Sequence, residues 1–154
     1  MNAYVGTGQS GAIVSMVERA SKLTLLVKTS GKSAEEVTKA LLDRMSEHKY
    51  FVHTLTSDNG KEFSQHQKVS ESLEAGFYFA KPYHSWERGL NEHTNGLVRQ
   101  YFPKSKRFDE ISDEQLMNVE ILINNRPRKV LKFASPIEVF NHLARETENV
   151  ALHG

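Results

Sequence analysis

Apolar residues run together in two short segments near the start of the chain. Residues 12–18 and 23–29 are rich in β-branched and apolar residues, which is typical of strands. Residues 18–22 between them are few enough for a hairpin. The glycine-rich residues 6–11 would turn the chain out of an earlier strand, of which we expect residues 2–5 only. The pattern therefore predicts three opening strands joined by tight turns, with the first strand truncated.

Helical and strand patterns alternate after this point. Ser33 and Glu36 have the spacing of a capping box, and apolar residues follow at helical intervals. The next expected elements are a buried strand, a helix and a short strand, at residues 51–55, 62–74 and 77–80. We expect the buried strand to end at Asp58 and Pro82 to stop the short one.

The remaining pattern is helical. Three helices are expected, with starts at Ser85, Ser112 and Ser135. Pro103 would end the first of them. Pro136 occupies the first helical position of the last, where a missing N–H does no harm.

This order of elements predicts an α/β domain with a mixed five-stranded sheet flanked by helices. Strands joined by tight turns are antiparallel, and strands joined through helices are parallel. A chain of 154 residues fits one domain, so we expect a single domain over residues 1–154. Ligands in such sheets gather at the carboxyl ends of the strands, and Asp58 is expected at that edge.

Composition narrows the chemistry. The chain has no cysteine, so a metal site would use carboxylate or imidazole ligands. No apolar run approaches the ~20 residues that span a bilayer. The net charge is +1, but the charges are unevenly distributed. Residues 99–107 and 126–132 are basic, whereas residues 109–120 and 146–148 are acidic. Basic segments with aromatic residues suit a nucleic-acid partner, although solvated surface is the commoner meaning of a charge run.

Two acidic residues are the candidate catalytic and metal-binding groups. Asp58 closes the buried strand, and Glu92 lies one turn into the helix that begins at Ser85. Hard cations such as Mg²⁺ take one or two protein carboxylates together with waters and substrate phosphates. The pair therefore indicates phosphodiester chemistry. Taken alone, Asp58 also suits a plain turn and Glu92 a solvated helix position.

Basic and amide residues near the two acids are candidate DNA contacts. Arg88, Asn95 and Arg99 lie four residues before, three after and seven after Glu92, on the same helical face. Either arginine is suited to contact phosphate or to hold Glu92, and a surface ion pair suits Arg99 equally well. Asn95 is suited to bond the acid or the DNA backbone. Further candidate phosphate ligands are Lys61, Lys104, Lys106 and Arg107.

Three strings of residues carry a family resemblance. They are Thr-Ser-Asp-Asn-Gly-Lys-Glu-Phe (56–63), Pro-Tyr-His-Ser-Trp-Glu-Arg-Gly-Leu-Asn-Glu-His-Thr-Asn-Gly-Leu-Val-Arg-Gln-Tyr-Phe-Pro-Lys (82–104) and Asn-Asn-Arg-Pro-Arg-Lys-Val-Leu (124–131). Over residues 6–140 the chain resembles the catalytic core of insertion-sequence transposases, most closely the bacterial family named for insertion sequence thirty. That family belongs to the superfamily of DDE transposases and retroviral-type integrases.

The resemblance implies a ribonuclease-H-like fold in which three carboxylates hold two Mg²⁺ or Mn²⁺ ions. Asp58 matches the second acid and Glu92 the third, with 33 residues between them. One ion activates the attacking oxygen and the other stabilises the leaving oxygen. The implied reactions are hydrolysis and strand transfer during DNA recombination. The implied partners are double-stranded DNA, both terminal repeats and target, and further copies of the chain. The implied location is the bacterial cytoplasm, at the nucleoid.

The chain departs from the family at the first acid. Family members carry it four residues before the glycine that here is Gly6, and that position is Asn2. No Asp or Glu precedes Glu18. An amide binds a cation less well than a carboxylate, so we expect weakened metal binding and little or no activity. The family's helix-turn-helix DNA-binding region, which precedes the core, is also expected to be absent.

Three alternative functions stay open at this point. A degenerate core would bind DNA or dimerise without cutting. A ribonuclease H would share the metal chemistry but leaves the segment at residues 124–128 unexplained. A small-molecule enzyme is the weakest alternative, because no phosphate-binding glycine-rich loop opens a helix.

Overall fold

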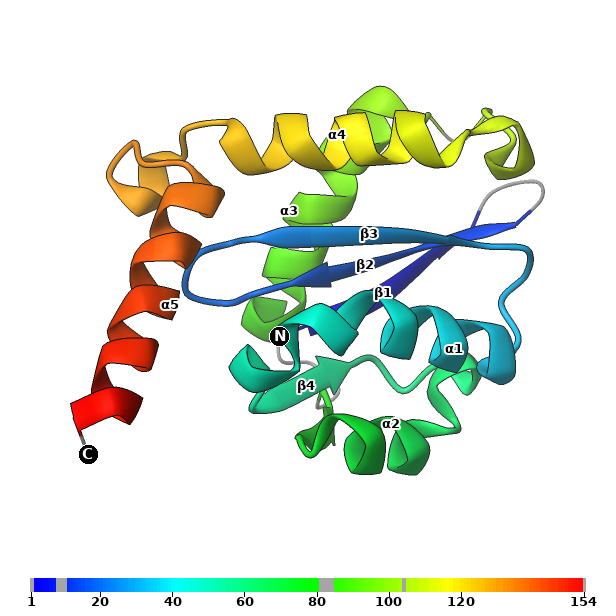
Figure 1. Ribbon diagram of the computed structural model, residues 1–154. Helices are drawn as coiled ribbons and strands as arrows, with labels where there is room; N and C mark the ends of the chain where they lie inside the picture. The colour runs from blue at the N-terminus through cyan, green and yellow to red at the C-terminus, as the bar shows by residue number, and fades with distance from the viewer. Residues whose placement is uncertain (1, 8–10, 81–84, 104, 154) are drawn as a thin grey trace.

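The computed structural model describes residues 2–7, 11–80, 85–103 and 105–153, and they contain one five-stranded sheet. The strands lie in the order β3-β2-β1-β4-β5 (Figure 1). The strands are β1 (Asn2–Thr7), β2 (Ala12–Val17), β3 (Thr24–Thr29), β4 (Thr54–Ser57) and β5 (Gly76–Phe79). The first three pair antiparallel, whereas β4 runs parallel to β1 and β5 parallel to β4. The predicted α/β class is therefore confirmed.

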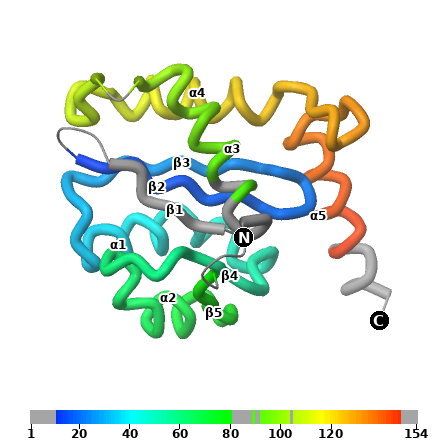
Figure 2. The backbone as a smooth tube through the Cα atoms, turned by 180° about the vertical axis from the view of Figure 1, so that it is seen from behind, coloured from blue at the N-terminus to red at the C-terminus, as the bar shows by residue number. Residues whose placement is uncertain are grey.

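Helices cover both faces of the sheet and one of its edges. They are α1 (Ala34–Met45), α2 (His66–Leu73), α3 (Ser85–Tyr101), α4 (Asp113–Asn125) and α5 (Pro136–His153). Short 3₁₀ turns join them at η1 (Ser46–Phe51), η2 (Lys61–Phe63), η3 (Phe108–Glu110) and η4 (Lys129–Leu131). Figure 2 shows α3 crossing the sheet on the face opposite α1.

The alternation of side chains along β2 divides the core into two layers. Successive residues of a strand point to opposite faces. Val14 and Met16 pack with Leu41 of α1, while Ile13 packs with Leu97 of α3 and Phe108. Every residue of β2 is buried, because helices cover both of its faces.

The helix starts predicted at Ser33, Ser112 and Ser135 are confirmed by their hydrogen bonds. Ser33 and Glu36 form the expected capping box, and so do Ser112 and Gln115. Ser135 and Glu138 bond in the same way, with 2.7 Å from the Ser135 amide nitrogen to the Glu138 carboxylate. Each cap satisfies amides that the first helical turn leaves unpaired, and is typically worth about 1 kcal/mol.

Helix α4 runs along β3 and closes that edge of the sheet (Figure 1). The Asn124 side chain accepts a hydrogen bond from the Thr24 amide at 2.8 Å and donates one to the Thr24 carbonyl at 2.7 Å. One turn earlier, the Glu120 carboxylate accepts from the Leu26 amide at 2.6 Å. These backbone groups are those that an edge strand leaves open to another chain. The helix supplies their partners from side chains.

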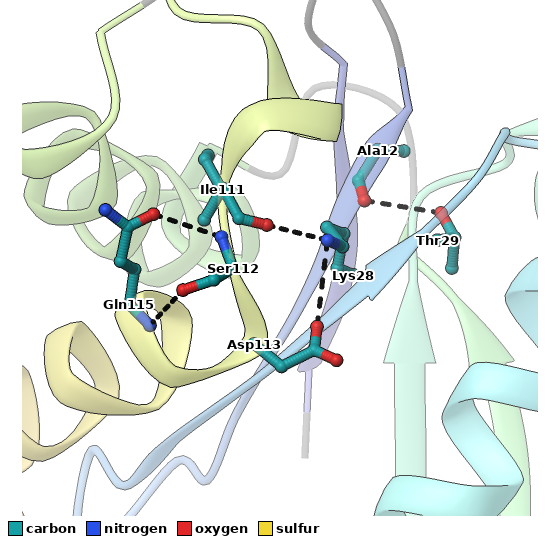
Figure 3. Close-up of polar contacts among 7 residues, drawn as sticks. All are labelled: Ala12, Lys28, Thr29, Ile111, Ser112, Asp113 and Gln115. Carbon is teal, nitrogen blue, oxygen red and sulfur yellow. Dashed lines mark hydrogen bonds and ion pairs between the residues drawn. The ribbon is translucent and has the colours of Figure 1, made fainter.

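The same helix is fixed at its start and from the side. Lys28 of β3 donates to the Ile111 carbonyl at 2.6 Å and lies 3.8 Å from the Asp113 carboxylate (Figure 3). Arg44 of α1 pairs with Glu120 at 2.6 Å. The edge is therefore held by contacts along the whole of α4.

Three predicted boundaries were wrong. β1 continues past residue 5, since Gly6 and Thr7 still pair with β2. The strand expected at residues 51–55 begins only at Thr54, because η1 carries the helical conformation on through Phe51.

The helix expected at residues 62–74 is also divided. Residues 61–63 form the 3₁₀ turn η2, and α2 begins only at His66. Gln65 separates them, with a backbone at φ −90° and ψ 26° that is not helical.

Candidate active site

Strands β1 and β4 are neighbours in the sheet, and two of the three expected acid positions, 2 and 58, lie on or directly after them. Asn2 lies in register with Thr56 and Ala3 with Ser57. Asp58 follows β4 directly. With strands about 4.8 Å apart and about 3.3 Å of rise per residue, the backbones at positions 2 and 58 are about 8 Å apart. A carboxylate at position 2 would thus be a neighbour of Asp58.

Asp58 and the helix that carries Glu92 belong to the same face of the sheet. Leu55 of β4 packs in the layer of α1 and α2. Alternation therefore directs Thr56, and Asp58 two residues later, to the other face. On that face α3 packs on β2, where the Ser15 hydroxyl donates to Asn95 Oδ1 at 3.1 Å. Asp58 and α3 therefore belong to the same face of the sheet, and the meeting of Asp58 with Glu92 stays a prediction.

The two acids differ in exposure. Asp58 is half-buried at the strand end, and Glu92 is exposed on α3. The helix is anchored by its other side, where Thr94, Leu97 and Val98 are buried. Such a helix holds the Glu92 backbone fixed while its carboxylate faces solvent.

The donor set fits a hard divalent cation in part. Two carboxylates suit a Mg²⁺ or Mn²⁺ ion that keeps several waters. Among the residues that the structure describes, no three His, Asp or Glu side chains gather closely enough to hold a metal. Position 2 would supply an amide rather than a third carboxylate. That Asp58 and Glu92 hold an ion stays a prediction.

Two predicted DNA contacts on α3 face the protein. Asn95 is half-buried on Ser15, and the Arg99 guanidinium lies 5.1 Å from the centre of the Phe108 ring. Both contacts fix α3 against the sheet and η3. Nothing tests their predicted contact with DNA, which stays a prediction.

The other predicted contacts are spread along the chain. Lys61 is exposed at the start of η2, three residues after Asp58. Lys106 is half-buried and Arg107 is exposed. Arg107 Nη2 lies 2.7 Å from Asp109 Oδ2. This hydrogen bond and the charge of the Asp109 carboxylate raise the pKa of Arg107. The side chain of Arg88 and all of Lys104 fall outside the described residues.

Sequence reasoning missed several polar contacts around α3 and α4. Ser15 is a buried hydroxyl in an otherwise apolar strand, and this was the available signal for a partner on α3. Asn124 and Arg128 belong to the Asn-Asn-Arg-Pro-Arg string, whose internal roles the sequence did not separate. Arg128 Nη1 lies 3.3 Å from His93 Nε2, so this string reaches the residue next to Glu92.

Known proteins similar to this chain include several transposases. The transposase of insertion sequence element IS4351 from Bacteroides fragilis is 44% identical over 146 residues, which cover 95% of this chain and 45% of that protein. Transposase InsI of IS30A from Escherichia coli K12 is 40% identical over 128 residues, which cover 82% of this chain and 33% of that protein. The chain is therefore similar to insertion-sequence transposases. It spans less than half the length of each of these two relatives.

Solved structures agree on the fold. The catalytic core domain of BIV integrase has a TM-score of 0.73 and 19% identity, with 96% of each chain covered. A simian T-cell lymphotropic virus intasome in complex with PP2A regulatory subunit B56 gamma matches with a TM-score of 0.66 and 20% identity, over 80% of this chain and 47% of that chain. No family model matches. The recognised resemblance to a DDE transposase or integrase core is confirmed. In the part of the chain that the structure describes, no helix is long and apolar enough to cross a membrane.

Proposed function

We propose that this chain is the catalytic core of a DDE-type transposase that cuts and joins DNA at the ends of a mobile element. The observation that carries the proposal is that β1 pairs parallel with β4, while α3 covers the face of the sheet to which Asp58 is directed. Asn2 lies in register with Thr56, and Asp58 and the helix of Glu92 occupy one face. The similarity to insertion-sequence transposases supports the same reading.

Asp58 and Glu92 would hold the divalent cations, with a first acid expected at position 2. Bound ions of this kind activate an attacking oxygen and stabilise a leaving one. The chain itself fixes where the cations and the DNA meet. β4 sets the position of Asp58, while packing of Leu97 and Val98 holds α3 with Glu92 outward. In this proposal the exposed Lys61, three residues after Asp58, would contact a phosphate of the DNA.

The amide at Asn2 supports a second function, that of a core that no longer cuts DNA. With an amide at the first position, the chain would bind metal weakly and cut DNA slowly or not at all. A degenerate core that binds DNA or dimerises would then be its role. Of the two functions we favour the catalytic core. In this proposal the chain acts as a single domain on double-stranded DNA, together with further copies of itself. Its location would be the bacterial cytoplasm, at the nucleoid.

Nicking of supercoiled plasmid in Mn²⁺ separates these functions. We expect little nicking by the chain as it stands and measurable nicking after Asn2→Asp, because the third carboxylate is restored. Adding Asp58→Asn or Glu92→Gln to that variant should abolish the gain. If Asn2→Asp binds DNA but never nicks it, the degenerate module is the better description. Preferential cutting of RNA–DNA hybrids would instead favour a ribonuclease H.

A further inference from the structure

A cavity of about 360 Å³ opens beside the helix that carries Glu92. It lies between the turn joining β2 to β3, the helix α3 and the loop after α4. Its lining residues are Lys22, Gly89, His93, Thr94, Arg128 and Val130. Two of them are cations and none is acidic. The lining is largely apolar, and the sign of its two charges favours an anion.

Arg128 is the unusual member of the lining. It is half-buried, and its Nη2 donates to the Ile123 carbonyl at 3.1 Å. Its Nε is buried, with no hydrogen-bond partner among the described residues. Within that same part of the chain it has no ion pair, whereas Arg44 and Arg107 each have one. Arg128 is therefore a cation in the cavity lining with no counter-ion among the residues that the structure describes.

Physical chemistry makes such an arrangement costly unless a ligand completes it. Burial lowers the pKa of Arg128, and the charge of Arg126 lowers it further. An unpaired buried donor destabilises the folded chain, and more so when it is charged. A guanidinium has five donors in a planar fork that matches phosphate oxygens. A phosphate would provide both the missing charge and the missing acceptors.

The cavity also lies beside the residues that flank Glu92 on α3. Gly89 lies one turn before Glu92 and His93 directly after it. A Cβ added at Gly89 would meet no atom within 4 Å, so the backbone there is open to close approach. The geometry points to this cavity as the site of one DNA backbone phosphate, bound by Arg128 with Lys22. The inference rests on the proposed function, since it takes DNA as the partner.

The test is duplex binding measured over a range of salt concentrations. We expect Arg128→Gln to weaken binding and to reduce the slope of log K against log salt by about one, the value for one phosphate contact. Lys22→Gln should also lower the affinity for duplex DNA. Arg145→Gln on α5 is the matched control, because it removes one exposed positive charge away from the cavity. Its slope should match that of the unaltered chain.

Three outcomes would overturn the inference, and they are distinguishable. If the unaltered chain binds no duplex, the proposed function fails and the phosphate site fails with it. If the chain binds but Arg128→Gln and Lys22→Gln both behave like Arg145→Gln, only the phosphate site fails.

The third outcome concerns the source of the phosphate. The Arg128 Nε–H resonance should move on addition of duplex and not on addition of inorganic phosphate at equal ionic strength. An equal response to inorganic phosphate would overturn the assignment to DNA and identify a site for a free anion. Because Lys22 is not part of the loop after α4, its variant keeps the test decisive even if Arg128→Gln disturbs that loop.

Discussion

Polar groups at the β3 edge have hydrogen-bond partners inside the chain, whereas the predicted acid Glu92 is exposed to solvent. At the edge, Asn124 and Glu120 supply partners for the backbone groups of Thr24 and Leu26. At the acid end, Glu92 is exposed, and it bonds no other side chain that the structure describes. Groups that serve the fold are completed inside the chain. The Glu92 carboxylate, by contrast, is left exposed to solvent, where an external cation could bind it.

The largest effect on stability is expected at Asn124. Asn124→Leu keeps the volume but leaves the Thr24 amide and carbonyl buried without partners. At about 1–3 kcal/mol for each of these two groups, the free energy of unfolding should fall by about 2–6 kcal/mol. Urea denaturation followed by circular dichroism measures this change.

The chain offers two controls for this substitution. Asn125→Leu makes the same change one residue later, where the side chain is exposed and bonds only its own helix at Ile121. Glu92→Gln alters the acid end. Both should change the free energy of unfolding by less than about 0.5 kcal/mol. Equal losses for Asn124→Leu and Asn125→Leu would contradict the role given to Asn124.

A smaller effect is expected at the ion pair that joins α1 to the same edge. Arg44 and Glu120 are each partly shielded from solvent, with side-chain exposures of 26% and 14%. Arg44→Gln should lower the free energy of unfolding by about 1 kcal/mol, because Glu120 keeps its bond to Leu26. The matched control is Arg107→Gln, whose exposed pair with Asp109 should contribute almost nothing. The account of the edge is weakened if Arg107→Gln proves the more harmful change.

Local signals predicted much of the fold. The capping boxes at Ser33 and Ser112 formed because their partners lie three residues away in the chain. The apolar run at residues 12–18 predicted a strand, which forms over Ala12–Val17 and is buried on both faces. By contrast, the strand expected to start at residue 51 was displaced by η1. There Phe51 packs edge-on against Phe140 of α5, a contact that no local pattern records.

Of the candidate site, the sequence allowed us to predict the acidic residues but not the roles of the residues around them. Asp58 was placed at a strand end from the apolar run before it, and the structure has it directly after β4. The roles of Asn124 and Arg128 could not be separated in the same way. Thr24, the partner of Asn124, lies 100 residues away in sequence. Arg128 is distinguished by a cavity whose walls come from three separate segments.

Binding of Mn²⁺ tests the central claim most directly, namely that positions 2, 58 and 92 form one metal site. Electron paramagnetic resonance titration should show weak binding by the chain as it stands. Asn2→Asp should tighten binding by at least about tenfold, or about 1.4 kcal/mol, because a carboxylate replaces an amide. Asp58→Asn or Glu92→Gln in that background should remove the gain. An Asn2→Asp variant that is folded but binds Mn²⁺ no more tightly would contradict the account.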